Sequence, residues 1–489
     1  MKEKIIPLFK QSAVYSLGRI AGPLVGIFMV PIYTRVFAPD DYGILSLVNV
    51  TIIFFGLLVL FGMDSSMARY YMDPKDDHDR ILTASTGLFF RATVFVAGAA
   101  IIICFSQDIS QLIFKTDAYN KYFVIAAATL PFAQCASLCL HMFRFNFRSK
   151  TYAVISTARI VLSISLTIFF VVGLKWGITG VFASHLIIAA ILLFNNLLLT
   201  KRYFHFTFSM RRLKELLHFG IPLIPYGITD YLLQNCDRYF LSYFATIEQV
   251  GLYSLGAQVA SILIILFIGA GLAWTPFVFS TYKEAGIKSI YSRVMGYFIA
   301  ATFLLVIALS LFSREIIIVF TTPQYYGASI VVPILALYLA FHYIGLHMSI
   351  GITISKKTFH FTWISVTVAV LNIGLNFLLV PPYGMLGAAL ATLISSIMWF
   401  LLLLFISQRY YYINYRLPSF IKILFVALVI ISINYLLLAE LNLQNVLIKI
   451  GLVGISLVCL YISGLIGKDE LKYVRSLARK VIHRSRIGQ

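Results

Sequence analysis

The sequence contains few charged residues and few long polar segments. Charged side chains make up 12% of the 489 residues, against about 25% in a typical soluble protein. Hydrophobic residues make up 60%, and the mean hydropathy is +0.90. This composition excludes an ordinary soluble domain, so we expect an all-α polytopic membrane protein.

The polar segments that connect the apolar runs are short, about 20 residues at most. They leave no room for a soluble catalytic domain, and no phosphate-binding loop motif of the Walker type occurs in the sequence. An intramembrane glycosyltransferase or ligase is an alternative, but such an enzyme usually needs carboxylates at the membrane edge and a sizeable external loop. We therefore expect a protein that is not an enzyme and that works inside the membrane.

Cysteine is also scarce. The five cysteines lie within or beside apolar runs, and Cys135 and Cys139 share a helix face without a histidine or carboxylate at ligand spacing. This setting is typical of small apolar helix residues. We expect no disulfide framework, no metal and no cofactor.

Fourteen apolar segments follow one another along the chain, each long enough to cross ~30 Å of hydrocarbon at ~1.5 Å per residue. The first carries Gly18, Gly22 and Gly26 at every fourth position, a pattern that lets another helix approach closely. We expect one transmembrane helix from each segment. The segments lie at 12–36, 42–64, 82–106, 120–143, 151–174, 178–200, 215–243, 249–279, 294–313, 326–351, 360–380, 384–407, 418–438 and 446–466.

The 39 Lys and Arg residues alternate with these segments. The two termini and the even-numbered connections hold 29 of them, the odd-numbered connections hold six, and the apolar segments hold four. This distribution follows the positive-inside rule and predicts that both termini are cytoplasmic. It also explains the net charge of +20 without a nucleic-acid partner, because basic cytoplasmic flanks attract anionic membrane lipids. The six cations predicted on the outer side are Arg35, Lys115, Lys121, Lys175, Arg314 and Lys449.

Two sequence matches indicate an internal repeat. YGILSL at 42–47 recurs as VGLYSL at 250–255, an offset of 208, and the glycine-rich stretch at 176–187 recurs at 383–394, an offset of 207. Because this offset equals six segments, the repeat is parallel and predicts two six-helix lobes with a substrate path between them. The expected parts are an N-terminal lobe at 1–203, a C-terminal lobe at 204–410, two additional helices at 411–467 and a basic cytoplasmic tail at 468–489.

Arg19, Arg91 and Arg159 each lie inside an apolar segment, nine to eleven residues past a basic residue at its cytoplasmic end. At ~1.5 Å per residue, all three lie roughly 13–17 Å into the membrane. The equivalent positions of the second lobe are uncharged. Arginine binds phosphates and carboxylates bidentately, so we predict that these three residues form an anion-binding cavity. The alternative is that each one reaches the headgroups or pairs with a backbone carbonyl.

Other polar residues inside the segments are candidates for gating, coupling or cavity lining. Asp230 is a candidate coupling residue, and Asp237 with Arg238 is a candidate packing or gate pair at the outer end. Asn372 and Asn376 share a helix face, where they either line the cavity or form hydrogen bonds between helices. The candidate cavity-lining residues are Ser16, Gln234, Asn372 and Asn376.

These residues and motifs resemble the polysaccharide flippase family, the O-antigen and capsule repeat-unit translocases of the multidrug/oligosaccharidyl-lipid/polysaccharide exporter superfamily. The resemblance covers nearly the whole chain. It rests on Arg19 followed by TRVFAPDDYG at 34–43, on DRYF at 237–240 followed by VGLYSL, and on the glycine-rich starts of the sixth and twelfth segments.

The resemblance implies a substrate, a direction and a location. The substrate is an undecaprenyl-pyrophosphate-linked oligosaccharide, moved by alternating access from the cytoplasmic to the outer leaflet of a bacterial inner membrane for surface polysaccharide biosynthesis. By this analogy, Arg19, Arg91 and Arg159 contact the diphosphate, and the polysaccharide polymerase machinery is a candidate partner. The alternative within the superfamily is a cation-coupled exporter of small molecules or drugs, although the three arginines disfavour a cationic cargo.

Overall fold

The computed structural model describes residues 24–74, 76–437 and 442–462, and within these ranges it is helical without β-strands. Eleven of its helices are long and apolar enough to cross a membrane. The prediction of an all-α polytopic membrane protein is therefore confirmed. The eleven are α2 (Pro39–Leu60), α4 (Asp77–Cys104), α6 (Asn120–Phe145), α7 (Ser149–Ile168) with the π-helical turn η1 (Phe169–Gly173), α8 (Gly177–Thr200) with η2 (Lys201–Tyr203), α13 (Ile262–Thr281), α14 (Ile287–Leu311), α16 (Val332–Met348) with α17 (Ile350–Ile354), α18 (Phe359–Tyr410), α19 (Leu417–Leu437) and α20 (Leu443–Ile462).

Shorter helices complete the remaining predicted segments. Residues Leu24–Val36 form the described part of the first segment. The seventh segment is divided into several pieces. Pro222 and Pro225, which lack the amide hydrogen that a continuous helix needs, lie at the starts of η3 and α10, and a further break at Cys236 separates α10 from α11. The shorter elements are α3 (Met63–Met72), α5 (Ser106–Phe114), α9 (Met210–Gly220), η3 (Ile221–Leu223), α10 (Ile224–Asn235), α11 (Asp237–Phe244), α12 (Ile247–Ala260), α15 (Ser313–Phe320) and η4 (Pro323–Ile330).

The 52-residue α18 contains two spans. Gly384, just after Pro381 and Pro382, has φ 53° and ψ −129°, a conformation outside the helical region that glycine adopts readily. The His360 imidazole lies 2.9 Å from the Tyr410 hydroxyl, so the two ends of α18 meet. The element is therefore a hairpin of two antiparallel helices, and its turn falls between the predicted segments 360–380 and 384–407.

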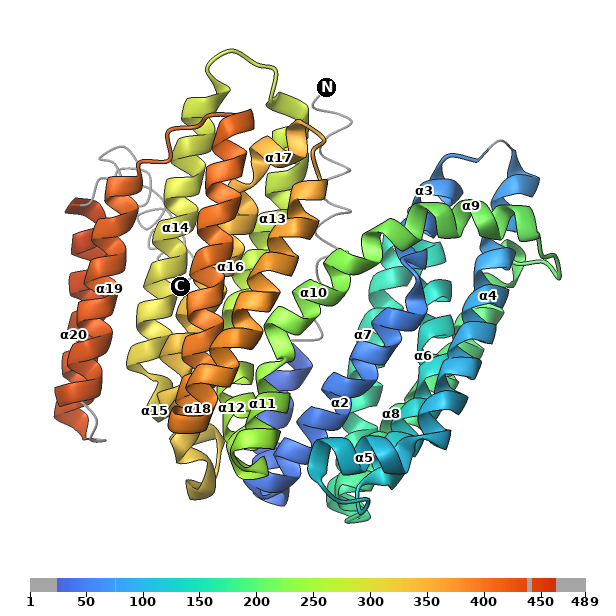
Figure 1. The fold of residues 1–489 in the computed structure, drawn as a ribbon, viewed down its shortest axis with the longest axis horizontal. Helices are drawn as coiled ribbons and strands as arrows, with labels where there is room; N and C mark the ends of the chain where they lie inside the picture. The colour runs from blue at the N-terminus through green and yellow to red at the C-terminus, as the bar shows by residue number, and fades with distance from the viewer. Residues whose placement is uncertain (1–23, 75, 438–441, 463–489) are drawn as a thin grey trace, which may run out of the picture.

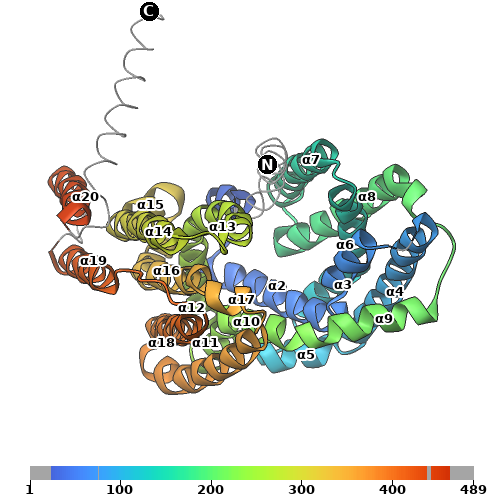
Figure 2. The ribbon, with the colours of Figure 1, turned by 90° about the horizontal axis from the view of Figure 1, so that it is seen from above.

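The helices form two groups that lie side by side (Figures 1 and 2). The first group comprises α2 to α8, in which α6 packs against α4 and α8. The second comprises α10 to α18, in which α16 and α18 pack together, and α19 and α20 lie against its α14. This arrangement agrees with two lobes and two additional helices, while the exact lobe boundaries stay a prediction.

The two groups meet where α2 crosses α12, at a pair of glycines that occupy equivalent positions in the repeat. A Cβ at Gly43 would lie 3.1 Å from the Gly251 nitrogen, and a Cβ at Gly251 would lie 3.2 Å from the Gly43 nitrogen. Each Cβ would also overlap a backbone carbonyl oxygen of the opposite helix, that of Ile247 or Pro39. Only glycine permits so close a crossing, because it places no side chain between the backbones.

The connection between the groups is fixed to the first group. The helix α9 packs against α3 and α4, the Ser66 hydroxyl donates to the Leu216 carbonyl oxygen over 2.7 Å, and Arg212 forms an ion pair with Asp79. The next helix, α10, packs instead against α18 and α2. The chain therefore passes from one group to the other around η3.

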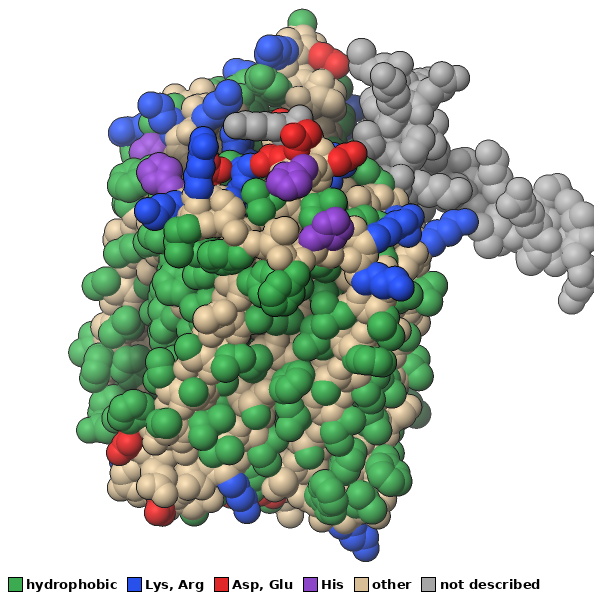
Figure 3. All heavy atoms as spheres, turned by 90° about the vertical axis from the view of Figure 1, so that its right-hand side faces the viewer, with side chains coloured by type: hydrophobic (Ala, Val, Ile, Leu, Met, Phe, Trp, Pro, Cys, Tyr) green, Lys and Arg blue, Asp and Glu red, His purple; other side chains and the backbone are tan. Residues whose placement is uncertain are grey.

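One face of the molecule displays the surface pattern of a membrane protein (Figure 3). Its charged side chains gather at the two ends, and a band of hydrophobic and uncharged side chains lies between them. A band of this kind is what hydrocarbon requires, since a charge in the bilayer is costly.

Candidate functional site

A cavity of about 380 Å³ lies in the first group, between α2, α6, α7 and α8. Along α8 its lining extends from Phe182 to Asn196, which at ~1.5 Å per residue is about 21 Å. The cavity therefore spans more than half of the hydrocarbon thickness. The polar residues in its lining are Asn49, Thr129, Gln134, Ser137, Arg159, Ser163, His185 and Asn196.

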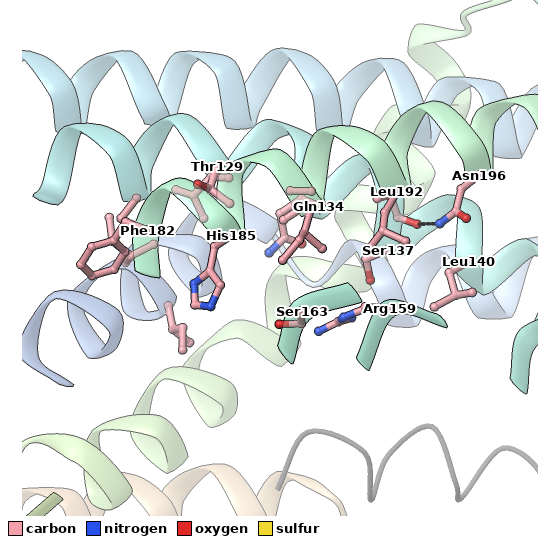
Figure 4. A pocket seen from close by; sticks show the side chains of 18 of the residues that line it. Thr129, Gln134, Ser137, Leu140, Arg159, Ser163, Phe182, His185, Leu192 and Asn196 are labelled. Carbon is pink, nitrogen blue, oxygen red and sulfur yellow. Dashed lines mark hydrogen bonds between the residues drawn. The ribbon is translucent and has the colours of Figure 1, made fainter. Parts of the chain in front are cut away.

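Arg159 is the residue of this lining whose side chain carries a permanent charge. Its guanidinium lies near Ser163 of α7 and Ser137 of α6, with Gln134 and His185 further along the cavity (Figure 4). Within the described ranges, no carboxylate lies close enough to Arg159 to form an ion pair. The cavity thus combines a cation with neutral hydrogen-bonding groups, a chemistry suited to an anion attached to polar hydroxyl groups.

Helical spacing explains how these residues reach one cavity. Arg159 and Ser163 are four residues apart on α7, and His185, Ala189 and Asn196 follow a similar spacing on α8. Residues three, four or seven apart share a helix face, so each helix turns one polar stripe inward. The Asn196 amide also donates to the Ala136 carbonyl oxygen over 3.1 Å, which ties α8 to α6 (Figure 4).

Arg91, which the sequence predicts at a similar depth to Arg159, lies on another side of α6. It is 1% exposed, forms an ion pair with Asp64 and donates to the Gln134 carbonyl oxygen over 3.2 Å. His141 lies 3.6 Å from the same Asp64 carboxylate. In this conformation the guanidinium joins α4 to α3 and α6 and is not in the lining of the cavity, so its predicted contact with an anion stays a prediction. Arg19 and Ser16 lie outside the described residues.

Asp230 forms a small polar cluster between α10 and α16. Gln234 donates to one of its carboxylate oxygens over 2.9 Å, and the His342 imidazole lies 3.9 Å from the other. That second oxygen is buried and has no hydrogen-bond partner among the described residues. His342 itself is stacked on Trp399. Asp230 and Gln234 therefore lie in the second group, away from the cavity.

Asp237 and Arg238 are neighbours in sequence, but their side chains have different partners. Asp237 is fully buried and accepts hydrogen bonds from Tyr253 and, over 3.0 Å, from Thr392 of α18. Arg238 donates to the hydroxyl of Ser254 over 3.1 Å and to the side-chain oxygen of Asn235 over 3.1 Å. The two residues thus do not form an ion pair with each other, although each joins different helices near the contact between the groups.

Asn372 and Asn376 are both fully buried. The Asn372 amide donates to Ser395 over 3.2 Å across the α18 hairpin, and its oxygen accepts from the Cys236 thiol over 2.9 Å. The Asn376 amide donates to both the backbone and the side-chain oxygen of Asn372. Of the two alternatives weighed from the sequence, this geometry matches hydrogen bonds between helices and not the lining of the cavity.

Hydrogen bonds join the two groups along one half of the molecule, from the level of the midpoint of α2 to the predicted outer end. Near the midpoint, Tyr231 donates to the Val50 carbonyl oxygen over 2.9 Å. Closer to the outer end, Ser242 donates to Ile113 over 2.6 Å and Tyr325 donates to Phe37 over 2.9 Å. The groups are thus closed against each other at the end that faces away from the predicted cytoplasm.

Several polar residues of the cavity were not selected from the sequence. Gln134, Ser137 and Asn49 are single polar residues in apolar helices, and His185 is a single histidine within the apolar segment 178–200. The signal that could have found them is the four-residue spacing from Arg159 to Ser163 and the matching stripe on α8. A polar stripe on one helix does not reveal which neighbouring helix it faces. The polar residues of the cavity can therefore be identified only once the packing of α6, α7 and α8 is known.

Comparison with known proteins places this geometry in a family. Residues 8–283, more than half of the chain, match the family described as polysaccharide biosynthesis protein. An uncharacterized membrane protein of Haemophilus influenzae is 23% identical over 287 residues, 58% of this chain and 67% of that protein. An uncharacterized membrane protein of Methanocaldococcus jannaschii is 22% identical over 479 residues, 88% of this chain and 90% of that protein.

Two solved structures share the fold. A lipid II flippase, MurJ, in an inward closed conformation, superposes with a TM-score of 0.74 at 17% identity, covering 94% of this chain and 100% of that one. An outward-facing multidrug resistance transporter of the MATE family superposes with a TM-score of 0.61 at 15% identity, covering 82% and 95%. The resemblance inferred from the sequence is therefore confirmed, and the chain belongs to the polysaccharide biosynthesis protein family.

Proposed function

We propose that this protein is a flippase that moves undecaprenyl-pyrophosphate-linked oligosaccharide repeat units from the cytoplasmic to the outer leaflet by alternating access. The observation that carries the proposal is the cavity around Arg159, a cation that has no ion-pair partner in the part of the chain that the structure describes and that lies beside neutral hydrogen-bonding side chains. The guanidinium suits the diphosphate of such a substrate, and the amide and hydroxyl groups suit its sugars. Membership of the polysaccharide biosynthesis protein family supports the same substrate class.

The closed outer end supports the direction of transport. Because the two groups are closed against each other at the outer end, cargo would enter between them from the opposite side. The alternation of charge along the sequence predicts that this side is the cytoplasm. Export of a cationic small molecule fits less well, because Arg159 would repel such a cargo. The bacterial inner membrane, the cytoplasmic termini and a role for polymerase machinery belong to this proposal.

The test is flipping in proteoliposomes by the full chain and by variants of Arg159. A fluorescent undecaprenyl-diphosphate oligosaccharide in the vesicles, with a quencher that does not cross the membrane, reports how much substrate changes leaflet. We expect Arg159→Gln to lower the rate about tenfold to a hundredfold, the effect of losing a hydrogen bond to a charged group, and Arg159→Lys to retain part of it.

The matched control is Arg148→Gln, which removes the same charge from the exposed start of α7, outside the cavity. It should flip the substrate at the normal rate. If Arg159→Gln folds normally and also flips at the normal rate, the proposed anion contact is wrong. If the unaltered chain flips no lipid-linked oligosaccharide but exports a small cation from the same vesicles, the proposed function itself is wrong.

A further inference from the structure

A second pocket, which we call the outer cationic pocket, lies at the predicted outer end of the first group. Its volume is about 600 Å³. It is formed where three separate connections meet: the one after Leu24–Val36, the start of α6, and the turn between η1 and α8. Its cations are Arg35 at the end of Leu24–Val36, Lys121 at the start of α6 and Lys175 in the turn between η1 and α8.

These three residues are half of the six cations that the sequence places on the outer side. Within the described ranges none of them forms an ion pair; Arg35 donates to the Pro31 carbonyl oxygen over 2.9 Å, and the Lys121 ammonium lies 5.2 Å from the Tyr122 ring centre. By contrast, Lys449, another outer cation, pairs with Glu315 over 2.6 Å. Among the described residues, the pocket thus gathers three cations that form no ion pair, whereas Lys449 has a carboxylate partner.

The acidic residue in the lining does not neutralise this charge. Asp41 accepts a hydrogen bond from the Ala38 amide over 3.2 Å and so stabilises the start of α2. With three cations and one carboxylate, the charged side chains of the lining sum to +2. Like charges repel, so their convergence from three connections is unfavourable unless an anion joins them.

The start of α8 adds to the positive potential. Gly177, Ile178 and Thr179, the first three residues of this 24-residue helix, line the pocket. The first amides of a helix have no carbonyl partner within the helix and carry the positive end of its dipole. Gly177 adopts φ +59°, and no other atom lies within 4 Å of the position a Cβ would take, so this glycine is required by the turn while the space beside it is open.

The outer cationic pocket is aligned with the cavity around Arg159. Tyr122 lines the outer pocket and Phe182 lines the cavity, and their ring centres lie 5.9 Å apart. On α6, Tyr122 is one helical turn from Ala126 of the cavity lining. The two aromatic rings therefore lie between two sites whose cations form no ion pair with any described residue.

We propose that the outer cationic pocket binds a phosphate-type anion, either the diphosphate of delivered cargo or the phosphate of a lipid headgroup in the outer leaflet. Lysine and arginine side chains together with helix amides are the groups that proteins use for phosphate. Binding of the cargo diphosphate rests on the proposed function, whereas binding of a lipid headgroup phosphate does not. In both cases the anion lies between the three cations, above the Tyr122–Phe182 ring pair.

The experiment uses the full chain in lipid nanodiscs and Trp176 as the reporter, because this residue lines the pocket and is 50% exposed. Inorganic pyrophosphate is added to nanodiscs of pure phosphatidylcholine, and the fluorescence difference between the chain and Trp176→Phe is followed. We expect a saturable change whose half-saturation concentration rises about tenfold in the double variant Lys121→Gln/Lys175→Gln.

Two further variants locate the effect. Arg314→Gln removes an outer cation that is not in the pocket and should leave the half-saturation concentration unchanged. Arg148→Gln, at the exposed start of α7 and in neither pocket, should also leave it unchanged. Because the readout is pyrophosphate binding and not flipping, failure of the proposed function and failure of this pocket can be told apart. Should the double variant not fold, Arg35→Gln at the exposed rim serves in its place.

A second arm distinguishes the two sources of phosphate. If phosphatidylglycerol in the nanodisc changes the Trp176 signal without pyrophosphate and weakens pyrophosphate binding, the lipid headgroup is the ligand. If only pyrophosphate changes the signal, the cargo diphosphate is the ligand. No change with either probe, or an equal loss in Arg314→Gln, overturns the proposal.

Discussion

The hydroxyl groups of Ser46 and Ser254 lie 2.8 Å apart, although 208 residues separate them in the chain. The same offset relates YGILSL to VGLYSL, so each serine is the repeat equivalent of the other. A residue contacts its own equivalent only when both lie next to the symmetry axis. The axis of the internal repeat therefore passes between α2 and α12, where Gly43 and Gly251 also meet.

This contact offers a way to lock the outer end. In a background without the native cysteines, we expect Ser46→Cys/Ser254→Cys to form a disulfide on oxidation, because the two side chains already meet. The linked protein should stop flipping and recover with reductant, measured in the same vesicles before and after reduction. The single cysteine variants should not respond to oxidant. Normal flipping by the fully linked protein would contradict the view that the outer end has to open.

Gly251→Ala tests the close crossing of the two groups. The added Cβ would overlap the Pro39 carbonyl oxygen, so we expect the free energy of unfolding to fall by about 1–3 kcal/mol. Thermal unfolding in detergent is the measurement. Gly374→Ala is the matched control, because nothing lies within 4 Å of its Cβ position. Equal melting temperatures for the two variants would argue against the tight crossing.

A double-mutant cycle on Arg91 and Asp64 separates positioning from substrate binding. Since Arg91 is buried, Asp64→Ala leaves its charge without a carboxylate, and we expect a loss of about 3 kcal/mol of stability or more. Arg91→Met/Asp64→Ala should recover much of this loss, because neither charge then remains.

The flipping rate of that double variant decides the role of Arg91. Near-normal flipping would show that Arg91 positions α4 against α6. A loss as large as that of Arg159→Gln, in a protein of normal stability, would instead support the prediction that both arginines contact the anion.

Asp230 is expected to link transport to an ion gradient. One of its oxygens is buried and has no hydrogen-bond partner among the described residues, so an arriving cation or proton would find an acceptor there. Asp230→Asn should make the flipping rate insensitive to an imposed proton or sodium gradient, while the Trp176 response to pyrophosphate stays normal. Glu248→Gln, which removes one carboxylate at the exposed start of α12, is the control for a general change of charge. Unchanged gradient dependence in Asp230→Asn would exclude the residue as the coupling site.

The sequence predicted those features that depend on order along the chain. Apolar length and alternating charge located the spans, and the 384–407 segment begins at Gly384, where the α18 hairpin turns. The repeat offset predicted a parallel relationship that the Ser46–Ser254 contact reflects directly. The positions of the spans and of the repeat depend on the rise of a helix per residue and on the charges of the connections. Packing against neighbouring helices changes neither of these.

The direction of each side chain could not be predicted in this way. Depth placed Arg91 and Arg159 at one level, but depth does not reveal that α6 separates them or that Asp64 lies beside only one of them. From the sequence, Asn372 could equally line the cavity or form a hydrogen bond between helices. In the structure the α18 hairpin places Ser395 opposite it, and the two side chains form a hydrogen bond. The rotation of each helix about its own axis is set by packing against neighbouring helices, and one sequence alone contains little information about that rotation.

The short turn η3 has a mechanical consequence. The element before it, α9, is fixed to one half of the molecule by Ser66 and by the Arg212–Asp79 ion pair. The element after it, α10, packs mainly against α18 of the other half and also contacts α2. Any change in angle between the halves has to be absorbed over Ile221–Leu223, where Pro222 already prevents a continuous helix. We expect these three residues to act as the pivot of the proposed alternating access, and their stiffness to set how readily the two halves change their angle.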